Sequence, residues 1–183
     1  MKRIIILTLL FFSLTQFNAN AQENHGSTMN LGLGVGGYAG YYGYVGRSIP
    51  VFHFDYEFNM ARNFTLAPFA NLYLYSRDYY SAGNGAYYTY REIVVPIGVK
   101  GTYYFDEQFQ ASSKWDFYAA GSLGFSIVGR RWESGYDGNG NVYGSPNDLF
   151  LDAHVGAEYH FNGRMGVFLD LSTGVSTIGL AFH

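Results

Sequence analysis

Several alternating segments of this sequence carry charged side chains that could take part in chemistry, and within a segment these charges are separated by an even number of positions. In residues 51–60, Asp55 and Glu57 alternate with aromatic residues, and in residues 149–161, Asp152 and Glu158 alternate with mainly apolar ones. Because alternate residues of a β-strand point to the same face, we expect these charges to collect on one face of a sheet. The candidate residues of this polar face are Asp55, Glu57, Glu92, Lys100, Asp152, Glu158 and Asp170, with Arg130, His53, His154 and His160 beside them.

Two interpretations of this polar face are open if the sheet closes into a barrel. Hydrated charges would form a proton or ion pathway, whereas paired charges would form a structural network that fixes strand register. The network is favoured because side chains fill the interior of an eight-stranded barrel. Lys100, Glu57 and Glu158 are expected at similar depth, so we expect Lys100 to pair with Glu57, with Glu158, or with both.

Metal binding receives little support from the spacing of the histidines. His154 and His160 lie six residues apart on one strand face, about 20 Å at the rise of a strand, so they cannot share an ion. His53 with Asp152 or His154, across the barrel, is a weak candidate for a transition-metal pair. No metal or other cofactor is therefore predicted.

A calcium loop is also disfavoured. Residues 137–141 (Asp-Gly-Asn-Gly-Asn) resemble the start of such a loop, and Asp148 falls at its twelfth position. However, Val142 stands where the sharp turn requires glycine, and no helix pair flanks the segment. Ordinary Asn and Gly turn chemistry explains the run more simply.

Nucleophilic hydrolysis needs a base next to a serine in space. The only His-x-Ser sequence is His25-Gly26-Ser27, which precedes the first expected strand, and residues 76–91 and 130–148 contain no histidine. We therefore expect no enzymatic activity, with a lipid-modifying enzyme as the less favoured alternative.

Composition favours a chain of many short strands. Hydrophobic residues make up 48%, aromatic residues 20% and charged residues only 14%, and there are 24 glycines. The absence of cysteine excludes disulfides, thiol catalysis and Cys-based zinc sites. A formal net charge of −3 gives no reason to expect a nucleic-acid partner.

Eight segments alternate between apolar and polar or small residues, which predicts an all-β, antiparallel up-and-down barrel. Pro68 and Pro96 lie inside two of these strands, where proline usually marks a bulge. Long connections (41–50, 76–91 and 130–148) alternate with shorter ones (61–63, 106–115 and 162–164), and the short connection near 172–174 is the exception. This alternation is typical of transmembrane β-barrels. The expected strands are 29–36, 51–60, 64–75, 92–105, 117–129, 149–161, 165–172 and 178–182.

The apolar faces of these strands carry no charge, and the polar faces are mostly Gly, Ser, Ala, Asn and Tyr. A polar face in water should be dense in Lys and Glu, so the apolar face is expected to contact lipid and the polar face to pack inside. A soluble lipocalin-like binding barrel, apolar inside, is the alternative. Two aromatic girdles are expected, with Tyr41, Tyr42, Tyr44, Tyr75, Tyr87 and Tyr88 at the long-loop rim and Tyr103, Phe105, Trp115, Phe117, Tyr159 and Phe161 at the short-turn rim.

The N-terminus predicts export. Lys2 and Arg3 precede an apolar stretch at residues 4–12, and Ala19-Asn20-Ala21 is the small-x-small pattern of a cleavage site. We expect cleavage between Ala21 and Gln22. The expected organisation is a signal peptide at 1–21, a periplasmic lead-in at 22–27 and a barrel domain at 28–183.

Together with this signal and the eight strands, two stretches resemble the small outer-membrane β-barrel domain proteins, similar in build to the OmpA and OmpX barrels of Gram-negative bacteria. They are Ile93-Val94-Val95-Pro96-Ile97-Gly98-Val99-Lys100 with Tyr103-Tyr104-Phe105, and Gly179-Leu180-Ala181-Phe182. The resemblance implies an integral outer-membrane protein, a monomer among outer-membrane lipid and lipopolysaccharide. It also implies that Gly179, Leu180 and Phe182 form the signal for the barrel-assembly machinery. Family members commonly end on an aromatic residue, whereas here His183 follows Phe182.

The outer connections combine tyrosine with small, adaptable residues, which is the composition of binding loops. A solvated loop beside an aromatic girdle has the same composition. The predicted function is a non-enzymatic outer-membrane barrel that is structural in the envelope or binds an unknown extracellular ligand. The candidate binding residues are Tyr79, Tyr80, Tyr87, Tyr88, Trp132, Tyr136 and Tyr143.

Overall fold

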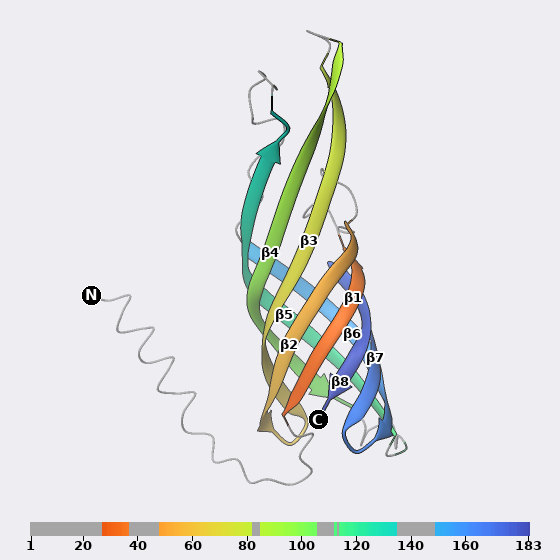
Figure 1. Cartoon of the computed structure of the whole chain (residues 1–183). Helices are drawn as coiled ribbons and strands as arrows, with labels where there is room; N and C mark the ends of the chain where they lie inside the picture. Colours follow the sequence, from red (N-terminus) through yellow and green to blue (C-terminus); the bar gives the residue numbers. More distant parts are fainter. Residues whose placement is uncertain (1–26, 37–47, 82–84, 106–111, 113, 135–148) are drawn as a thin grey trace, which may run out of the picture.

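The computed structural model of the chain describes residues 27–36, 48–81, 85–105, 112, 114–134 and 149–183. They form eight antiparallel strands, each hydrogen-bonded to its neighbours in sequence, and the last strand pairs with the first to close a barrel (Figure 1). The described part of the chain holds no helix that is long and apolar enough to cross a membrane. The strands are β1 (Thr28–Gly36), β2 (Ser48–Ala61), β3 (Phe64–Ser81), β4 (Ala86–Tyr104), β5 (Trp115–Trp132), β6 (Leu149–Asn162), β7 (Met165–Ser172) and β8 (Val175–Phe182).

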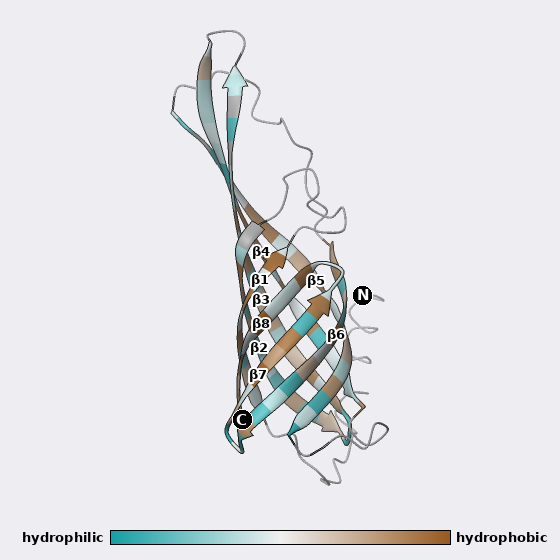
Figure 2. Cartoon of the chain, turned by 90° about the vertical axis from the view of Figure 1, so that its right-hand side faces the viewer, coloured by the Kyte–Doolittle hydropathy of each residue, from teal (hydrophilic) through white to brown (hydrophobic). Residues whose placement is uncertain are grey.

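Along the strands, apolar residues face the outside of the barrel wall and polar residues face its interior. Leu123 and Ile178 are each 57% exposed on the outside, whereas Asp55 and Glu92 are fully buried inside. Apolar and polar residues accordingly alternate along the strands in Figure 2. A continuous apolar outer face cannot remain in water, and β-barrels whose strands alternate apolar-out and polar-in are the kind that cross membranes. The protein is therefore a transmembrane β-barrel, and the lipocalin-like arrangement with an apolar interior is wrong.

Pro68 and Pro96 interrupt hydrogen-bond ladders without shifting them. Between β2 and β3, the register is the same at Asp55↔Phe69 and at Phe58↔Leu66, on either side of the gap beside Pro68. Between β3 and β4, the register is the same at Ala70↔Ile97 and at Tyr73↔Val94, on either side of the unpaired positions that include Pro96. The predicted bulges are therefore wrong at both prolines, and the missing N–H only omits local pairs.

The β3–β4 connection is shorter than predicted because both strands continue past the barrel rim. Ser76 to Ser81 pair with Arg91 to Ala86, within the stretch 76–91 that the sequence suggested was a loop. In Figure 1 these two strands rise beyond the others at the end opposite the C-terminus. Tyr80 and Tyr87 face each other across this extension with ring centroids 5.1 Å apart, a cross-strand aromatic pair that supports the hairpin.

The interior is packed with side chains near the long-loop end. Val51, Tyr73, Tyr75, Val94 and Val175 form a buried apolar cluster, which we call the outer plug. The rings of Tyr73 and Tyr75 stack with their centroids 6.0 Å apart. Tyr75, predicted for the outer aromatic girdle, thus lies inside the barrel, because its strand is longer than expected and the alternation turns it inward.

Phe168 fills the interior further down, against two glycines that pair across the β1–β8 ladder, Gly32 and Gly179. A Cβ would stand 3.1 Å from the Phe168 ring at Gly32 and 2.6 Å from it at Gly179. Glycine in these strands therefore marks the close approach of a large ring to the backbone.

The aromatic girdle at the short-turn end agrees with the sequence. Trp115 stacks on Phe117 at 6.0 Å and packs against Tyr159 at 5.0 Å, and Tyr159 meets Phe161 at 5.8 Å. Trp115 and Phe161 are exposed on the outer face. Such rings suit the interfacial zone of a bilayer.

Candidate functional site

The first group of polar side chains inside the barrel surrounds Lys100 of β4. Its ammonium group donates to the Asp55 carboxylate and lies 3.8 Å from Glu57 Oε1, with both carboxylates on β2. All three residues are at most 4% exposed. The expected Glu57 contact is present, but Asp55 is the direct partner.

Neutral donors from neighbouring strands complete this group. Asn30 of β1 donates to Asp55 at 2.7 Å and to Glu57 at 3.1 Å. Thr65 of β3 and Tyr104 of β4 donate to Glu57 at 2.6 and 2.8 Å. The Lys100 cluster therefore consists of Asn30, Asp55, Glu57, Thr65, Lys100 and Tyr104, with His53, whose ring nitrogens lie 3.0 Å from Asp55 and 2.6 Å from Asn71.

The expected pair between Lys100 and Glu158 is wrong. The ladders align Lys100 with Ser122 and Ser122 with Asp152, whereas Glu158 stands opposite Asp116, further toward the short-turn end. The strands of a barrel are staggered, so equal distance from a strand end does not mean equal depth.

A second group surrounds His154 of β6. Its Nδ1 lies 2.8 Å from Asp170 of β7, its Nε2 lies 2.9 Å from the Ser122 hydroxyl of β5, and Tyr118 donates to Asp170 at 3.2 Å. The hydrogen-bond order Ser122–His154–Asp170 matches that of serine hydrolases. However, Ser122 is 5% exposed and faces the packed interior, so the arrangement offers no position for a substrate beside the hydroxyl.

Sequence reasoning missed this relay because it sought serine and histidine close together in the chain. The available signal was that Ser122, His154 and Asp170 all lie on inward faces of three consecutive strands. The structure also places His53 and His154 in separate hydrogen-bonded groups, so the weak candidate metal pair formed by them is wrong.

Asp152 links this second group to the short β7–β8 turn. Its carboxylate accepts hydrogen bonds from the hydroxyls of Ser172 and Thr173 at 2.9 and 2.7 Å. It also accepts from the backbone N–H groups of Gly174 and Val175, at 2.7 and 3.1 Å. Together, Tyr118, Ser122, Asp152, His154, Asp170 and these turn residues form what we call the His154 cluster. A buried carboxylate thus stabilises the short β7–β8 connection at the long-loop end.

A third group lies at the short-turn end, and we call it the mouth cluster: Asp116, Glu158, His160 and His183, with Thr28. His183 Nε2 is 2.8 Å from Glu158 Oε1, and His160 Nε2 is 2.7 Å from Asp116 Oδ2. His183 entered the sequence reasoning only as the residue after Phe182.

The remaining predicted residues lie at several places. Glu92 is buried near the long-loop end, where it accepts from the Tyr90 hydroxyl at 2.6 Å and stands opposite Arg130 in the β4–β5 ladder. Gly179, Leu180 and Phe182 lie on β8, paired with β1 and β7. Tyr79, Tyr80, Tyr87 and Tyr88 belong to the extended hairpin, and Trp132 ends β5. Ala19, Ala21, Gln22, Tyr41, Tyr42, Tyr44, Tyr136, residues 137–141, Tyr143 and Asp148 lie outside the described residues.

Two arginines form an outward polar pocket just above the apolar band at the long-loop end. Arg91 of β4 and Arg131 of β5 are directly opposite in the ladder, and both are exposed. Thr89, Glu133 and Ser134 complete the lining of a pocket of about 440 Å³. Sequence analysis did not single out this pair, because only the strand register brings the two positions together.

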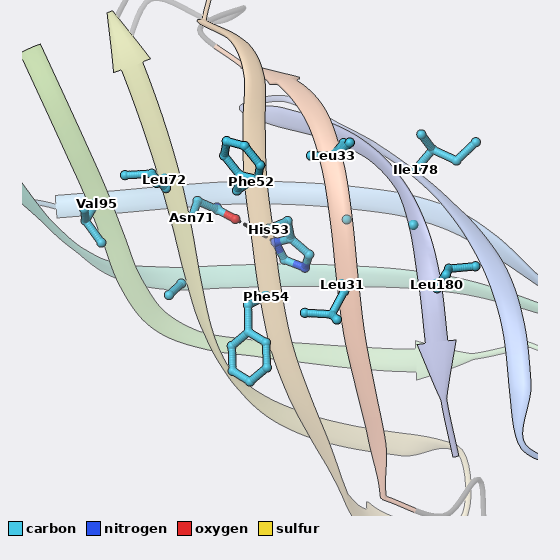
Figure 3. Close-up of a pocket in the computed structure, with 13 residues that line it drawn as sticks. Leu31, Leu33, Phe52, His53, Phe54, Asn71, Leu72, Val95, Ile178 and Leu180 are labelled. Carbon is cyan, nitrogen blue, oxygen red and sulfur yellow. Dashed lines mark hydrogen bonds between the residues drawn. The ribbon is translucent and has the colours of Figure 1, made fainter.

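A shallow apolar groove of about 680 Å³ lies on the outer wall over β1, β2, β3 and β8. Figure 3 shows Phe52, Phe54, Leu31 and Leu180 on this face, while His53 and Asn71 turn to the inside and bond each other. The groove belongs to the apolar outer wall of the barrel.

The chain was compared with known proteins in three ways. Neither a scan against protein-family models nor a search of curated proteins found a match. Among solved structures, the N-terminal β-barrel domain of Pseudomonas aeruginosa OprF is 11% identical with a TM-score of 0.48, covering 87% of this chain and 98% of that one. The attachment invasion locus protein Ail of Yersinia pestis is 7% identical with a TM-score of 0.42, covering 85% and 97%. A structure from the de novo design of transmembrane β-barrels is 10% identical with a TM-score of 0.47, and the match covers 88% of this chain and 98% of that one.

Eight antiparallel strands, closure of β8 on β1, a polar interior and an apolar outer face define the architecture. The chain is thus an eight-stranded, antiparallel transmembrane β-barrel, the fold class that its sequence predicted.

Proposed function

We propose that this protein is a non-enzymatic barrel of the outer membrane that holds a binding hairpin above the membrane surface. One observation carries the proposal: side chains pack the interior, while β3 and β4 continue past the rim and present Tyr80 and Tyr87 to solvent. Tyr80 is 52% exposed and Tyr87 is 71% exposed. Rigid tyrosines on a paired hairpin offer contact area at a low cost in conformational entropy.

The packed interior argues for a scaffold rather than a channel. The outer plug fills one level of the interior, and the Lys100 cluster fills another with groups that are bonded to each other. A hydrated pathway needs polar groups that remain open to water, whereas Asp55 and Lys100 are at most 4% exposed.

Lipid with phosphate groups is the membrane partner that we propose, and lipopolysaccharide of the outer leaflet is the source. Like charges directly opposite on neighbouring strands repel each other, and Glu133 in the same pocket supplies one negative charge for the two guanidinium groups of Arg91 and Arg131, so a further anion stabilises the pair. Guanidinium groups bind phosphate in a bidentate manner. Their position directly above the apolar band is where phosphate groups of the lipid lie. Assembly through Gly179, Leu180 and Phe182, and a monomeric state, belong to the same proposal.

Paired substitutions at neighbouring positions test the membrane face. Leu123→Arg places a charge on the outer wall and should lower the free energy of unfolding in lipid vesicles by about 2 to 4 kcal/mol. Ser122→Arg points inward, so its effect should come from crowding. A fluorophore at position 123 should report lipid, and one at position 122 should not. The opposite result would contradict the apolar-out orientation.

Single cysteines test the orientation, since the chain has none of its own. Tyr87→Cys in the hairpin should react with a membrane-impermeant maleimide on intact cells. Gly163→Cys in the β6–β7 turn is the matched control, because a Cβ there meets no atom within 4 Å, and it should react only after lysis. Labelling of Gly163→Cys alone on intact cells would refute the outward hairpin.

Binding itself is tested on arrays of glycans and extracellular proteins. The purified barrel should bind at least one class of probe, and Tyr80→Ser with Tyr87→Ser should reduce that signal while the barrel remains folded. Planar bilayers should show no steady conductance. A barrel that conducts ions, or that binds nothing on the arrays, would contradict the proposal.

A further inference from the structure

Three potential metal ligands converge at the short-turn mouth of the barrel. His183 Nε2 lies 2.8 Å from Glu158 Oε1, and His160 Nδ1 lies 3.7 Å from the same oxygen. One donor atom from each residue falls within 4.8 Å of the others. The two imidazole rings have centroids 4.8 Å apart at an angle of 39°, so their inner nitrogens face a shared space beside the Glu158 carboxylate.

The outer nitrogen of each ring is held by another group. His160 Nε2 is 2.7 Å from Asp116 Oδ2, and His183 Nδ1 is 3.0 Å from Thr28 Oγ1. Metal-bound histidines almost always donate their second N–H to a carboxylate or a comparable oxygen, which fixes the tautomer and the ring orientation. When the proton is on His160 Nε2 and on His183 Nδ1, the nitrogens beside Glu158, which are His160 Nδ1 and His183 Nε2, each offer a lone pair to an ion.

Backbone bonds preorganise the mouth cluster. His160 N donates to Lys114 O at 2.9 Å, and His183 N donates to Arg164 O at 3.0 Å. Gly166 stands opposite His160 in the ladder, and a Cβ at Gly166 would run into the Glu158 carboxylate. The glycine therefore makes the room in which the carboxylate reaches the two rings.

We infer that Glu158, His160 and His183 form a binding site for a divalent transition-metal ion of the zinc class, with Asp116 and Thr28 orienting the two histidines. Imidazole ligands suit zinc, copper, nickel and iron, whereas calcium and magnesium require sets of oxygen ligands. In a tetrahedral zinc site, nitrogen and oxygen ligands lie about 2.0–2.2 Å from the ion and therefore about 3.3 Å from one another. The two distances from the Glu158 oxygen, 2.8 Å to His183 and 3.7 Å to His160, lie on either side of that value.

An ion can reach this site from the barrel mouth. The side chains of His160 and His183 are 19% and 14% exposed, in contrast to the 7% of His154 in the middle of the barrel. Three protein ligands leave a fourth position for water. Sequence reasoning missed the site because it compared His160 with His154 along one strand, whereas the partner of His160 lies two ladders away, after β8.

Metal titration of the full chain, refolded in detergent micelles, tests this inference. Calorimetry with Zn²⁺ should give one saturable site, and Co²⁺ should give visible absorption bands typical of low coordination number. Ca²⁺ should not compete. His183→Gln and Glu158→Gln should abolish the saturable site, and Asp116→Asn should weaken zinc binding by about 10- to 100-fold. Zinc should raise the thermal midpoint of the wild type and not that of His183→Gln.

His53→Gln is the matched control, because His53 is a histidine inside the same barrel whose hydrogen bonds go to Asp55 and Asn71, away from the mouth cluster. It should leave zinc binding unchanged. The competing interpretation is a set of hydrogen-bonded histidine–carboxylate pairs with no metal. Absence of saturable binding in the folded wild type, or equal affinity in wild type, His183→Gln and His160→Gln, would overturn the inference.

Discussion

The Lys100 cluster and the His154 cluster bury carboxylates in opposite halves of the barrel and stabilise them in different ways. The Lys100 cluster joins β1 to β4 and sets Asp55 and Glu57 around one permanent cation. The His154 cluster joins β5 to β8 and surrounds Asp152 and Asp170 with hydroxyl, imidazole and backbone donors. The first half thus adds a buried cation to its neutral donors, whereas the donors described around Asp152 and Asp170 are hydroxyl, imidazole and backbone groups.

Aromatic rings form direct contacts between the two halves. Tyr104 of the first cluster and Tyr118 of the second meet edge to face with centroids 5.8 Å apart. Phe168 of β7 meets His53 of β2 in the same manner at 6.4 Å. The comparison predicts that single substitutions will affect the first half more than the second.

Removal of Lys100 should have the largest effect. Lys100→Met leaves Asp55 and Glu57 buried without their cation, and breaking one side of a buried ion pair costs about 3–5 kcal/mol. Urea unfolding in lipid vesicles, followed by tryptophan fluorescence, measures the loss. Adding Asp55→Asn should restore part of the stability, because Asp55 is the direct partner.

Glu158→Gln is the matched control for that rescue, since Glu158 bonds His183 rather than Lys100. It should restore nothing in the Lys100→Met background. Rescue by Glu158→Gln alone would show that the ion pairs are arranged differently from this structure.

Asp152 should give an intermediate effect. Asp152→Ala removes the acceptor of four hydrogen bonds, so the N–H groups of Gly174 and Val175 keep only the Ser172 hydroxyl as acceptor, at a cost of about 2–3 kcal/mol. Asp152→Asn keeps the shape and one acceptor oxygen, so it should cost less. Hydrogen exchange of the Gly174 and Val175 amides should rise in Asp152→Ala. If exchange of these amides is unchanged, Asp152 does not stabilise the turn.

Ser122 should give the smallest effect. Ser122→Ala removes one hydrogen bond to His154, while Asp170 still holds the ring, so the loss should be about 1 kcal/mol. Wild type and variant should also be equally inactive on an activated ester. If the wild type hydrolyses the ester and Ser122→Ala does not, then Ser122, His154 and Asp170 are catalytic, and the purely structural role is wrong.

The strands and their faces were largely predictable from the sequence. Alternation alone placed Phe52 and Phe54 outside and Asp55 inside, because the two-residue period is a local property. The extension of β3 and β4 was not predictable in the same way. Ser, Arg, Asp and Gly between residues 76 and 91 look like a loop, and only their pairing with each other makes them strands.

The partners within the interior were less predictable. Alternation tells which residues face inward, but the stagger of eight strands decides which of them meet. Lys100 was therefore assigned the wrong second carboxylate, and the convergence of His160 with His183 was missed. Both errors concern register between strands far apart in the chain, which no local pattern encodes.

The seam between β1 and β8 has a consequence for the order of folding. Thr28 and His183, which touch across it, stand 155 positions apart in the chain. Pairing β1 with β8 therefore closes the longest loop in the molecule, and such long-range contacts form slowly because the loss of chain entropy precedes the gain in bonding. Until β8 arrives, β1 and β7 present unpaired edges to other chains. We therefore expect the β1–β8 seam to be the last part of the barrel to form. The chain is most exposed to aggregation in the interval before the seam closes.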